Sequence, residues 1–409
     1  MSAVARTRSA VSPLHRPFVA YPVRRPTVNE VVAADRPEEP VHCLRPAVVA
    51  QTARDFVAGF PGDVLYAVKC NPDPAVLRAL WDGGVRHFDC ASLPEIRLVR
   101  TMFPQAAIHF MHPVKARGAI REAWARHGVR DFVLDSADEL AKIRTEIAAT
   151  GVSGALGLIV RIELPKGVAM LDLSGKFGAN AGEAVTLLRS ARNCAATLGI
   201  SFHVGSQCLD PLAWRDALAV TAQIIAAAAV RVDVIDVGGG FPVPYPGQEP
   251  PAMGAFFAEI EAGFDRLGLP AARLWAEPGR ALVAAGTSVV VQVQARRGNA
   301  LYVNDGVYGS LADAGTLAFR YPVRLIRPDG AAADETTGFS LFGPTCDSAD
   351  VMFGPFLLPV DVAEGDWIEI GQLGAYGACL RTAFNGFDRA RIIEVADDGL
   401  AAEPLRVAA

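Results

Sequence analysis

The chain repeats one short pattern eight times between Val64 and Arg280: an apolar run rich in β-branched and aromatic residues, a polar or glycine-containing break, and a segment with helical spacing. Strands that alternate with helices pair in parallel, and eight such units predict an α/β fold built on a closed (β/α)8 barrel. An open doubly wound sheet is the alternative. The apolar runs are VLYAVK (64–69), RHFDCA (86–91), AIHFMHP (107–113), DFVLDS (131–136), LGLIVRIE (156–163), SFHVGSQ (201–207), DVIDVGGGF (233–241) and RLWAEPGR (273–280).

The pattern changes after Ala281, where β-rich runs follow one another with turn residues between them and little helical period. These runs, such as TSVVVQVQAR, ALYVND, TGFSLFGP and DWIEIGQL, predict a second, β-rich domain. We expect the barrel to span residues 45–283. Residues 1–44 and 284–409 would then form the second domain, with the barrel inserted within it.

The bulk composition excludes several classes of protein. A net charge of -5 over 409 residues gives no basis for expecting nucleic acid as a partner. Seven scattered cysteines without CxxC pairs favour a reducing, cytoplasmic setting and no metal site. No apolar run approaches the roughly 18 residues of a membrane helix, so we expect a soluble protein. Residues 1–29 carry five arginines and no acid, which resembles a transit peptide, but a disordered or edge-strand terminus is favoured.

Unusual polar residues fall where the predicted strands end, which is where barrels of this kind place catalytic groups. One of them is Lys69, one of only five lysines in the chain. Burial at a barrel mouth would lower the pKa of its amine, and a neutral amine can form a Schiff base with an aldehyde. A lone lysine would more often extend to solvent. The strand-end residues are Lys69, Asp89, His112, Arg161, His203, Gly238 to Gly240 and Glu277.

The loops after the last two strands, 236–242 and 276–282, suit a phosphate. Barrels often bind phosphate at these two loops, glycines expose backbone N–H groups, and Arg280 adds positive charge. Three glycines by themselves also make a tight turn. Together with a Schiff-base lysine, they indicate a phosphorylated aldehyde cofactor, pyridoxal 5'-phosphate.

At this level of detail the chain resembles the pyridoxal-phosphate decarboxylases of alanine-racemase-like fold, ornithine decarboxylases among them. The resemblance rests on YAVKCNP, FDCAS, KFGA, HVGSQ, DVGGGFP, EPGRALV, NDGVYGS, GPTCDSAD and GAYGACLRTAFNGF. It implies that Lys69 holds the cofactor covalently, that His203 stacks on its ring, and that Asp89 pairs with Arg161 beneath it. The cofactor-binding residues that it implies are Lys69, Asp89, Arg161, His203, Ser206, Gly238, Gly239, Gly240, Glu277, Gly279, Arg280 and Tyr376.

The resemblance also implies catalytic roles for Lys69, His203, Glu277 and Cys346. Glu277 would keep the pyridine nitrogen protonated, which favours decarboxylation, and Cys346 would donate a proton to the product. Without the resemblance, a cysteine is more often a small buried hydrophobe. The family is expected to form a homodimer with shared active sites, in which Asp350 pairs with Lys176. The substrate-binding residues that the resemblance implies are Asp347, for the distal ammonium, with Tyr308 and Phe384.

The substrate is the least determined part of the prediction. L-Ornithine, giving putrescine for polyamine biosynthesis, comes first, and lysine, giving cadaverine, second. The second acidic residue that ornithine decarboxylases carry after VYGS is absent, although Asp313 could replace it if the loop folds back. Arg320 or Arg324 could instead meet a distal carboxylate, as in diaminopimelate decarboxylation, and diaminobutyrate is a further candidate. An amino-acid racemase and a non-catalytic homologue are the alternative functions.

Overall fold

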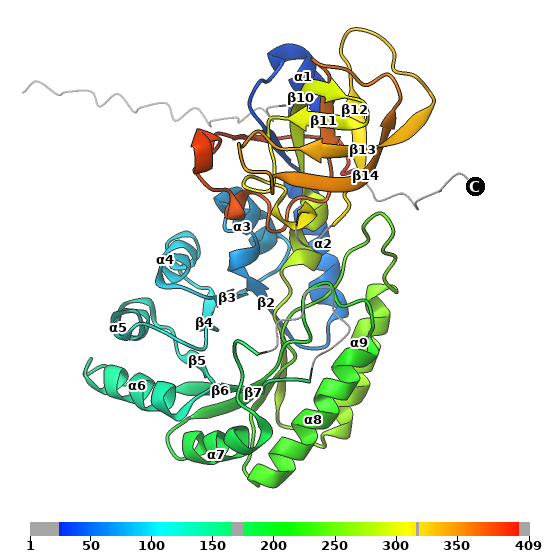
Figure 1. Ribbon diagram of the computed structural model, residues 1–409. Helices are drawn as coiled ribbons and strands as arrows, with labels where there is room; N and C mark the ends of the chain where they lie inside the picture. Colours follow the sequence, from blue (N-terminus) through cyan, green and yellow to red (C-terminus); the bar gives the residue numbers. More distant parts are fainter. Residues whose placement is uncertain (1–23, 166–174, 316–318, 401–409) are drawn as a thin grey trace, which may run out of the picture.

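A computed structural model describes residues 24–165, 175–315 and 319–400 of the chain (Figure 1). The arginine-rich stretch at 1–23 lies outside the described residues. Eight parallel strands close into a barrel in chain order, which confirms the (β/α)8 prediction over the open sheet. The strands are β2 (Asp63–Ala67), β3 (His87–Cys90), β4 (Ala107–Phe110), β5 (Asp131–Leu134), β6 (Gly157–Arg161), β7 (Thr197–Ser201), β8 (Val234–Asp236) and β9 (Arg273–Ala276).

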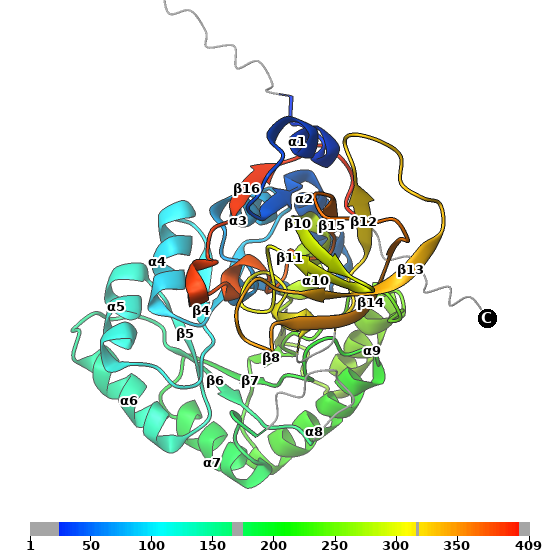
Figure 2. The same cartoon turned by 45° about the horizontal axis from the view of Figure 1, so that its top comes forward.

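Helices surround the barrel and pack their apolar faces against it, and four of them also begin at a capping side chain (Figure 2). The side chains of Asp73, Ser92 and Ser136 each accept a backbone N–H in the first turn of the helix that follows. Asn180 and Glu183 form a reciprocal capping box. The helices are α2 (Pro46–Gly59), α3 (Pro74–Asp82), α4 (Leu93–Met102), α5 (Arg117–His127), α6 (Ala137–Ala148), α7 (Ala181–Arg192), α8 (Leu212–Ala228), α9 (Met253–Arg266) and the short α10 (Arg280–Val283).

The bounds of the sixth barrel strand were predicted wrongly. SFHVGSQ (201–207) was expected to be the strand, but β7 ends at Ser201 and the rest of that stretch is loop. The backbone of β7 pairs with β6 from Thr197 and with β8 from Gly199, so the strand begins four residues earlier than expected. The outcome for His203 is unchanged, since it still follows the carboxyl end of a barrel strand.

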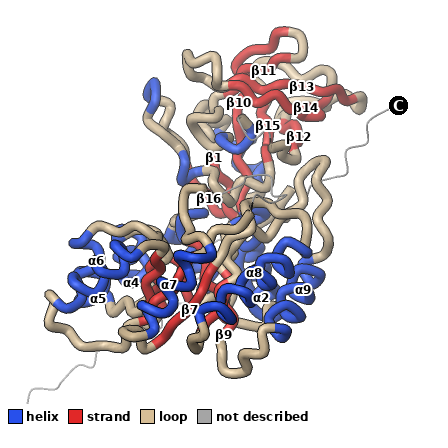
Figure 3. Tube along the Cα trace, turned by 60° about the horizontal axis from the view of Figure 1, so that its bottom comes forward, coloured by secondary structure: helices blue, strands red, loops and turns tan. Residues whose placement is uncertain are grey.

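The second domain is β-rich, as predicted, and its strands form a mixed sheet (Figure 3). Its strand order is β12-β15-β10-β11-β13-β14, and the N-terminal strand β1 joins it by pairing with β10 and, in parallel, with β16. The sequence runs indicated β10, β11, β13 and β15, and the other strands were not predicted. The elements are α1 (Val28–Asp35), β1 (Val41–Leu44), β10 (Thr287–Arg297), β11 (Ala300–Val303), β12 (Val323–Ile326), β13 (Thr336–Phe342), β14 (Val351–Pro359), β15 (Trp367–Ile370) and β16 (Arg391–Glu394).

A loop of the second domain reaches the barrel mouth. The backbone N–H of Tyr376 donates to the carbonyl of Cys70 at 3.0 Å, and the Asn71 side chain donates to the carbonyl of Gly374 at 2.8 Å. These bonds attach the loop beside Lys69, at the end of β2. None of the helices in the described ranges combines the length and the apolar character needed to cross a bilayer.

Candidate active site

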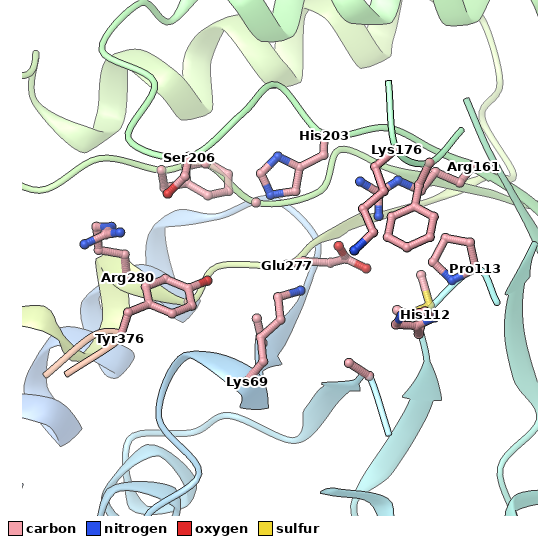
Figure 4. Close-up of a pocket in the computed structure, with 18 residues that line it drawn as sticks. Lys69, His112, Pro113, Arg161, Lys176, His203, Ser206, Glu277, Arg280 and Tyr376 are labelled. Atoms are coloured by element: carbon pink, nitrogen blue, oxygen red, sulfur yellow. The ribbon is translucent and has the colours of Figure 1, made fainter. Parts of the chain in front are cut away.

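A cavity of about 450 Å³ opens at the carboxyl ends of the barrel strands (Figure 4). Most of the predicted cofactor-binding residues line it, although they come from widely separated parts of the chain. The predicted residues in its wall are Lys69, Arg161, His203, Ser206, Gly239, Gly240, Glu277, Gly279, Arg280 and Tyr376. Asp89 contacts Lys69 but does not line the cavity, and neither does Gly238. The remaining predicted residues outside the lining are Tyr308, Cys346, Asp347 and Phe384.

Lys69 lies in a single turn of 3-10 helix directly after β2, and its side chain is 47% exposed in the cavity. Its Nζ is 3.2 Å from Oδ2 of Asp89, a residue of β3 that is 1% exposed. The Asp89 carboxylate raises the pKa of Lys69 above its ordinary value, although burial opposes this shift. The prediction of a neutral amine was therefore wrong for the chain alone, which holds Lys69 as an ammonium.

The predicted ion pair between Asp89 and Arg161 was also wrong. Asp89 pairs with Lys69, while the Arg161 guanidinium lies 5.9 Å from the centre of the Phe177 ring. Arg161 ends β6 on the opposite side of the cavity, where Phe177 and Lys176 also contribute to the wall (Figure 4). One oxygen of Asp89, Oδ1, is buried and has no hydrogen-bond partner among the described residues.

Glu277 follows β9 and belongs to a group of buried carboxyls. Its backbone N–H donates to the carbonyl of Gly238 at 2.8 Å, and the N–H of Gly238 donates to Oδ1 of Asp236 at 2.9 Å. Burial, with the nearby carboxyls of Asp236 and Asp89, raises the pKa of Glu277 well above its ordinary value. Burial likewise raises the pKa of Asp236 to about 6. Burial and the neighbouring carboxyls therefore favour the protonated form of Glu277. Sequence analysis missed Asp236, although this residue ends its strand.

His203 and the glycine triplet bring two loops into close contact. The Nδ1 of His203 accepts the backbone N–H of Gly205 at 3.0 Å, so a neutral ring carries its proton on Nε2. Burial, with the cations of Arg161 and Lys69, lowers the pKa of His203 to about 3. Gly240 has φ +104°, and a Cβ there would lie 2.3 Å from the carbonyl oxygen of Gly205. Glycine is thus required at position 240 for the two loops to lie this close together, as well as for exposing backbone N–H groups.

Arg280 lies at the other end of the cavity from Arg161, beside Tyr376 and Ser206 (Figure 4). It is 6% exposed, its Nη1 donates to the Tyr245 hydroxyl at 3.0 Å, and its Nη2 donates to Oδ2 of Asp313 at 2.9 Å. The buried Nε has no partner among the described residues. An unpaired guanidinium N–H at this position can bind an oxyanion.

Asp313, Arg320 and Arg324 do not take the substrate-binding positions considered for them. Asp313 is bound to Arg280, because this buried guanidinium needs a counter-charge. Arg320 donates to the carbonyl of Gly354 at 3.1 Å, and Arg324 forms a salt bridge of 2.6 Å with Glu369 in the β domain. A distal substrate carboxylate therefore has no support from these two arginines.

A profile for the family "Pyridoxal-dependent decarboxylase, pyridoxal binding domain" matches residues 47–284, which include all eight barrel strands. The chain belongs to this family. It is therefore a pyridoxal-phosphate-dependent decarboxylase, as predicted. Among its relatives, the lysine/ornithine decarboxylase of Selenomonas ruminantium is 33% identical over 79% of this chain and 81% of its own length. The ornithine decarboxylase of Schizosaccharomyces pombe is 33% identical over 81% of this chain and 78% of its own.

Solved structures of similar decarboxylases share the fold over nearly the whole chain. The lysine/ornithine decarboxylase of Vibrio vulnificus, complexed with putrescine, has a TM-score of 0.76 at 30% identity and covers 90% of this chain and 97% of its own. The arginine decarboxylase of Paramecium bursaria Chlorella virus has a TM-score of 0.79 at 28% identity and covers 90% and 99%.

The cavity of this decarboxylase fits the cofactor of its family. The unpaired Nε of Arg280 and the close glycine loops suit a phosphate at one end, and the Lys69 amine lies within the cavity between Asp89 and Glu277. The fit is electrostatic as well, because a phosphate dianion offsets part of the positive charge of Lys69, Arg161, Lys176 and Arg280.

The remaining predicted residues of the decarboxylase form a second cluster on the β domain. The Tyr308 hydroxyl donates to Asp347, whose other oxygen accepts the N–H of Ala349 at 2.9 Å. The rings of Tyr308 and Phe384 lie 4.9 Å apart, and Cys346 is exposed. This donor-rich environment lowers the pKa of Asp347, through the Ala349 N–H first and the Tyr308 hydroxyl second. The cluster carries an ionised acid and a free thiol outside the cavity of its own chain.

Asp350, expected to pair with Lys176, is engaged inside the same cluster. It is 2% exposed and accepts the N–H groups of Val307 at 2.8 Å and Thr345 at 3.1 Å. Asp350 thus has hydrogen bonds within its own chain, and its pairing with Lys176 stays a prediction.

Sequence reasoning missed how the loop after β4 is held. Lys115 has a fully buried side chain whose Nζ donates to the carbonyls of His112 at 2.9 Å and Val133 at 2.6 Å, 3.0 Å from Glu139. These contacts fix His112 and its neighbour in the cavity wall. The scarcity of lysine in the chain was the only sequence signal that could have indicated Lys115.

Proposed function

We propose that this decarboxylase acts on a basic L-amino acid, with L-ornithine as the first candidate and L-lysine as the second. The observation that carries the proposal is the position of the Lys69 amine, inside a barrel-mouth cavity between buried acids and an unpaired arginine N–H. The choice of substrate is supported by the relatives, whose names specify lysine, ornithine or both. The products would be carbon dioxide with putrescine or cadaverine.

The cavity of one chain is too cationic to hold a diamino acid by itself. Its wall carries Lys69, Arg161, Lys176 and Arg280, and Glu277 is the one acidic residue among the described residues that line it. A distal ammonium needs an opposing carboxylate. The exposed cluster with Asp347 offers one. We therefore propose a homodimer in which Cys346 and Asp347 of the partner subunit complete each cavity.

Each residue then has a separate role in the proposed reaction. Lys69 would anchor the cofactor covalently, and its phosphate end would be held by Ser206, Gly240, Arg280 and Tyr376. Gly238, Gly239 and Gly279 would belong to the glycine-containing loops beside it. When bound, the cofactor supplies the electron sink for the bond between Cα and the carboxylate. His203 would pack its neutral ring against the cofactor.

Proton positions follow from the pKa directions. Glu277, whose pKa is raised, would hold the proton that faces the pyridine nitrogen. Lys69 must lose a proton before it can act as a nucleophile, because Asp89 raises its pKa in the chain alone. Cys346 of the partner subunit would then deliver a proton to the substrate Cα, and Asp347 with Tyr308 and Phe384 would bind the distal end. A cytoplasmic role in polyamine biosynthesis would follow from the diamine product.

The test is a mass-spectrometric screen of the purified holoenzyme with ornithine, lysine, arginine, diaminobutyrate and diaminopimelate. We expect loss of carbon dioxide, fastest for ornithine or lysine. Formation of D-ornithine without carbon dioxide would instead indicate a racemase. Failure to decarboxylate any of the five would refute the proposal.

A further inference from the structure

A buried ion pair lies beneath the β-domain cluster and has no part in the chemistry described so far. Arg381 Nη2 donates to Oδ2 of Asp305 at 2.7 Å and lies 2.7 Å from Oγ of Ser310. The side chains of Arg381 and Asp305 are 10% and 1% exposed. Ser310 is in turn 3.0 Å from Nε2 of His42 in β1. Buried charge of this kind is costly unless it is fully paired.

The ion pair joins the two loops that carry the substrate-binding candidates. Asp305 also accepts the backbone N–H groups of Gly306 at 2.9 Å and Ser310 at 3.0 Å, which folds the loop around Tyr308. The residue after Arg381, Thr382, donates its N–H to the carbonyl of Tyr308 at 2.9 Å. Arg381 Nη1 donates to the carbonyl of Phe387 at 3.2 Å, across the turn that contains Phe384.

The contacts continue from Tyr308 to the acid of the cluster. The Tyr308 hydroxyl donates to Asp347, and its ring packs on Phe384. Gly309 packs directly against Asp305, since a Cβ there would lie 1.7 Å from Oδ1 of Asp305. Movement of Arg381 would therefore displace Tyr308, and with it the hydrogen bond that orients Asp347.

We infer that Arg381 is a positioning residue that sets the Asp347 carboxylate for a distal ammonium, acting through Asp305 and Tyr308. The segment that carries Arg381, orange-red in Figures 1 and 2, lies on the side of the β domain that faces α3 and α4. The substrate part of this inference rests on the proposed function. The structural part stands on the contacts alone.

The first test is hydrogen exchange on the holoenzyme with R381M, where the exchange rates are read by mass spectrometry. We expect faster exchange in peptides that cover 304–310, 344–350 and 380–387, with β10, β15 and α8 unchanged. The control is R389M, which removes an arginine with an 81% exposed side chain from the same region. Unchanged exchange at 304–310 and 344–350, or acceleration that spreads through β10 and β15, would overturn the inference.

The second test is a double-mutant cycle with Y308F. R381M should raise the KM for the diamino acid about tenfold, as expected for loss of a hydrogen bond to a charged group, and leave kcat within about threefold. In the Y308F background the same change should raise KM by less than about threefold, because the two residues act in series. An equal rise of KM in both backgrounds would show that Arg381 does not act through Tyr308.

Two further variants keep the tests decisive if R381M does not fold. R381K retains the charge, so its KM should lie between those of the wild type and R381M. D305N/R381M removes both charges together and should reproduce the exchange pattern of R381M. A wild type that decarboxylates none of the five amino acids screened would refute the proposed function, and the exchange experiment would then decide the inference alone.

Discussion

Replacement of His42 by glutamine should make the enzyme more resistant to acid. His42 lies in β1, is 2% exposed, and has Nε2 3.0 Å from Oγ of Ser310. Burial lowers the pKa of His42 from 6.5 to about 4. The Arg381 cation adds to this shift, and the Asp305 carboxylate opposes it. The native state therefore keeps this ring neutral at pH 5, where the unfolded chain protonates it.

The sign and size of the effect follow from proton linkage. Below pH 6.5 the unfolded state binds one more proton than the native state at this site, so stability falls as the pH falls. The loss levels off near pH 4, where the native ring also protonates. Between pH 7 and pH 5 His42 should cost the wild type about 2 kcal/mol of unfolding free energy. H42Q should be spared that loss, since glutamine does not titrate.

The measurement is urea unfolding of the holoenzyme and of H42Q at pH 8, 7 and 5, followed by tryptophan fluorescence. The two proteins should differ by a constant amount between pH 8 and 7. At pH 5 the gap should shift by about 2 kcal/mol in favour of the variant. An equal pH dependence in both proteins would show that His42 titrates in the native state as it does in the unfolded chain, and would refute the reasoning.

Three other substitutions have definite expected outcomes. D89N should lower the pKa of Lys69, so that the apoenzyme takes up pyridoxal phosphate at a lower pH; an unchanged pH profile of uptake, followed by absorbance, would contradict the dominant effect of Asp89. G240A should weaken cofactor binding at least about tenfold in a fluorescence titration, because φ +104° and the Gly205 carbonyl leave no place for a Cβ. C346A should slow turnover and divert part of it to aldehyde, and clean amine production at the wild-type rate would exclude the thiol as proton donor.

The barrel could be predicted from sequence because its periodicity is local: each strand and helix carries its own apolar pattern. The predicted strand ends then placed Lys69, His203 and Glu277 correctly in one cavity wall, although the bounds of β7 were wrong. What failed were pairings between distant residues. Nothing in the sequence distinguishes an Asp89 that pairs with Arg161 from one that pairs with Lys69.

The electrostatic errors have the same cause. Asp313 reads as a free acid until the fold places it 2.9 Å from Arg280, and the pKa of Lys69 depends on a carboxylate 20 positions away. Burial alone predicts a lowered lysine pKa, and a buried counter-charge reverses that direction. The direction of such a pKa shift can be determined only from the structure, since it depends on distances of a few ångströms between charged groups.

The pairing of β1 affects the order in which the nascent chain can fold on the ribosome. Val41 in β1 pairs with Val290 on one side and with Arg391 on the other. The strand β1 therefore has no partner until β10 has been translated, and it gains its second partner only with β16. All eight barrel strands precede β10 in the chain, so the barrel can close before β1 finds its first partner, and the β domain would be completed only when β16 has emerged.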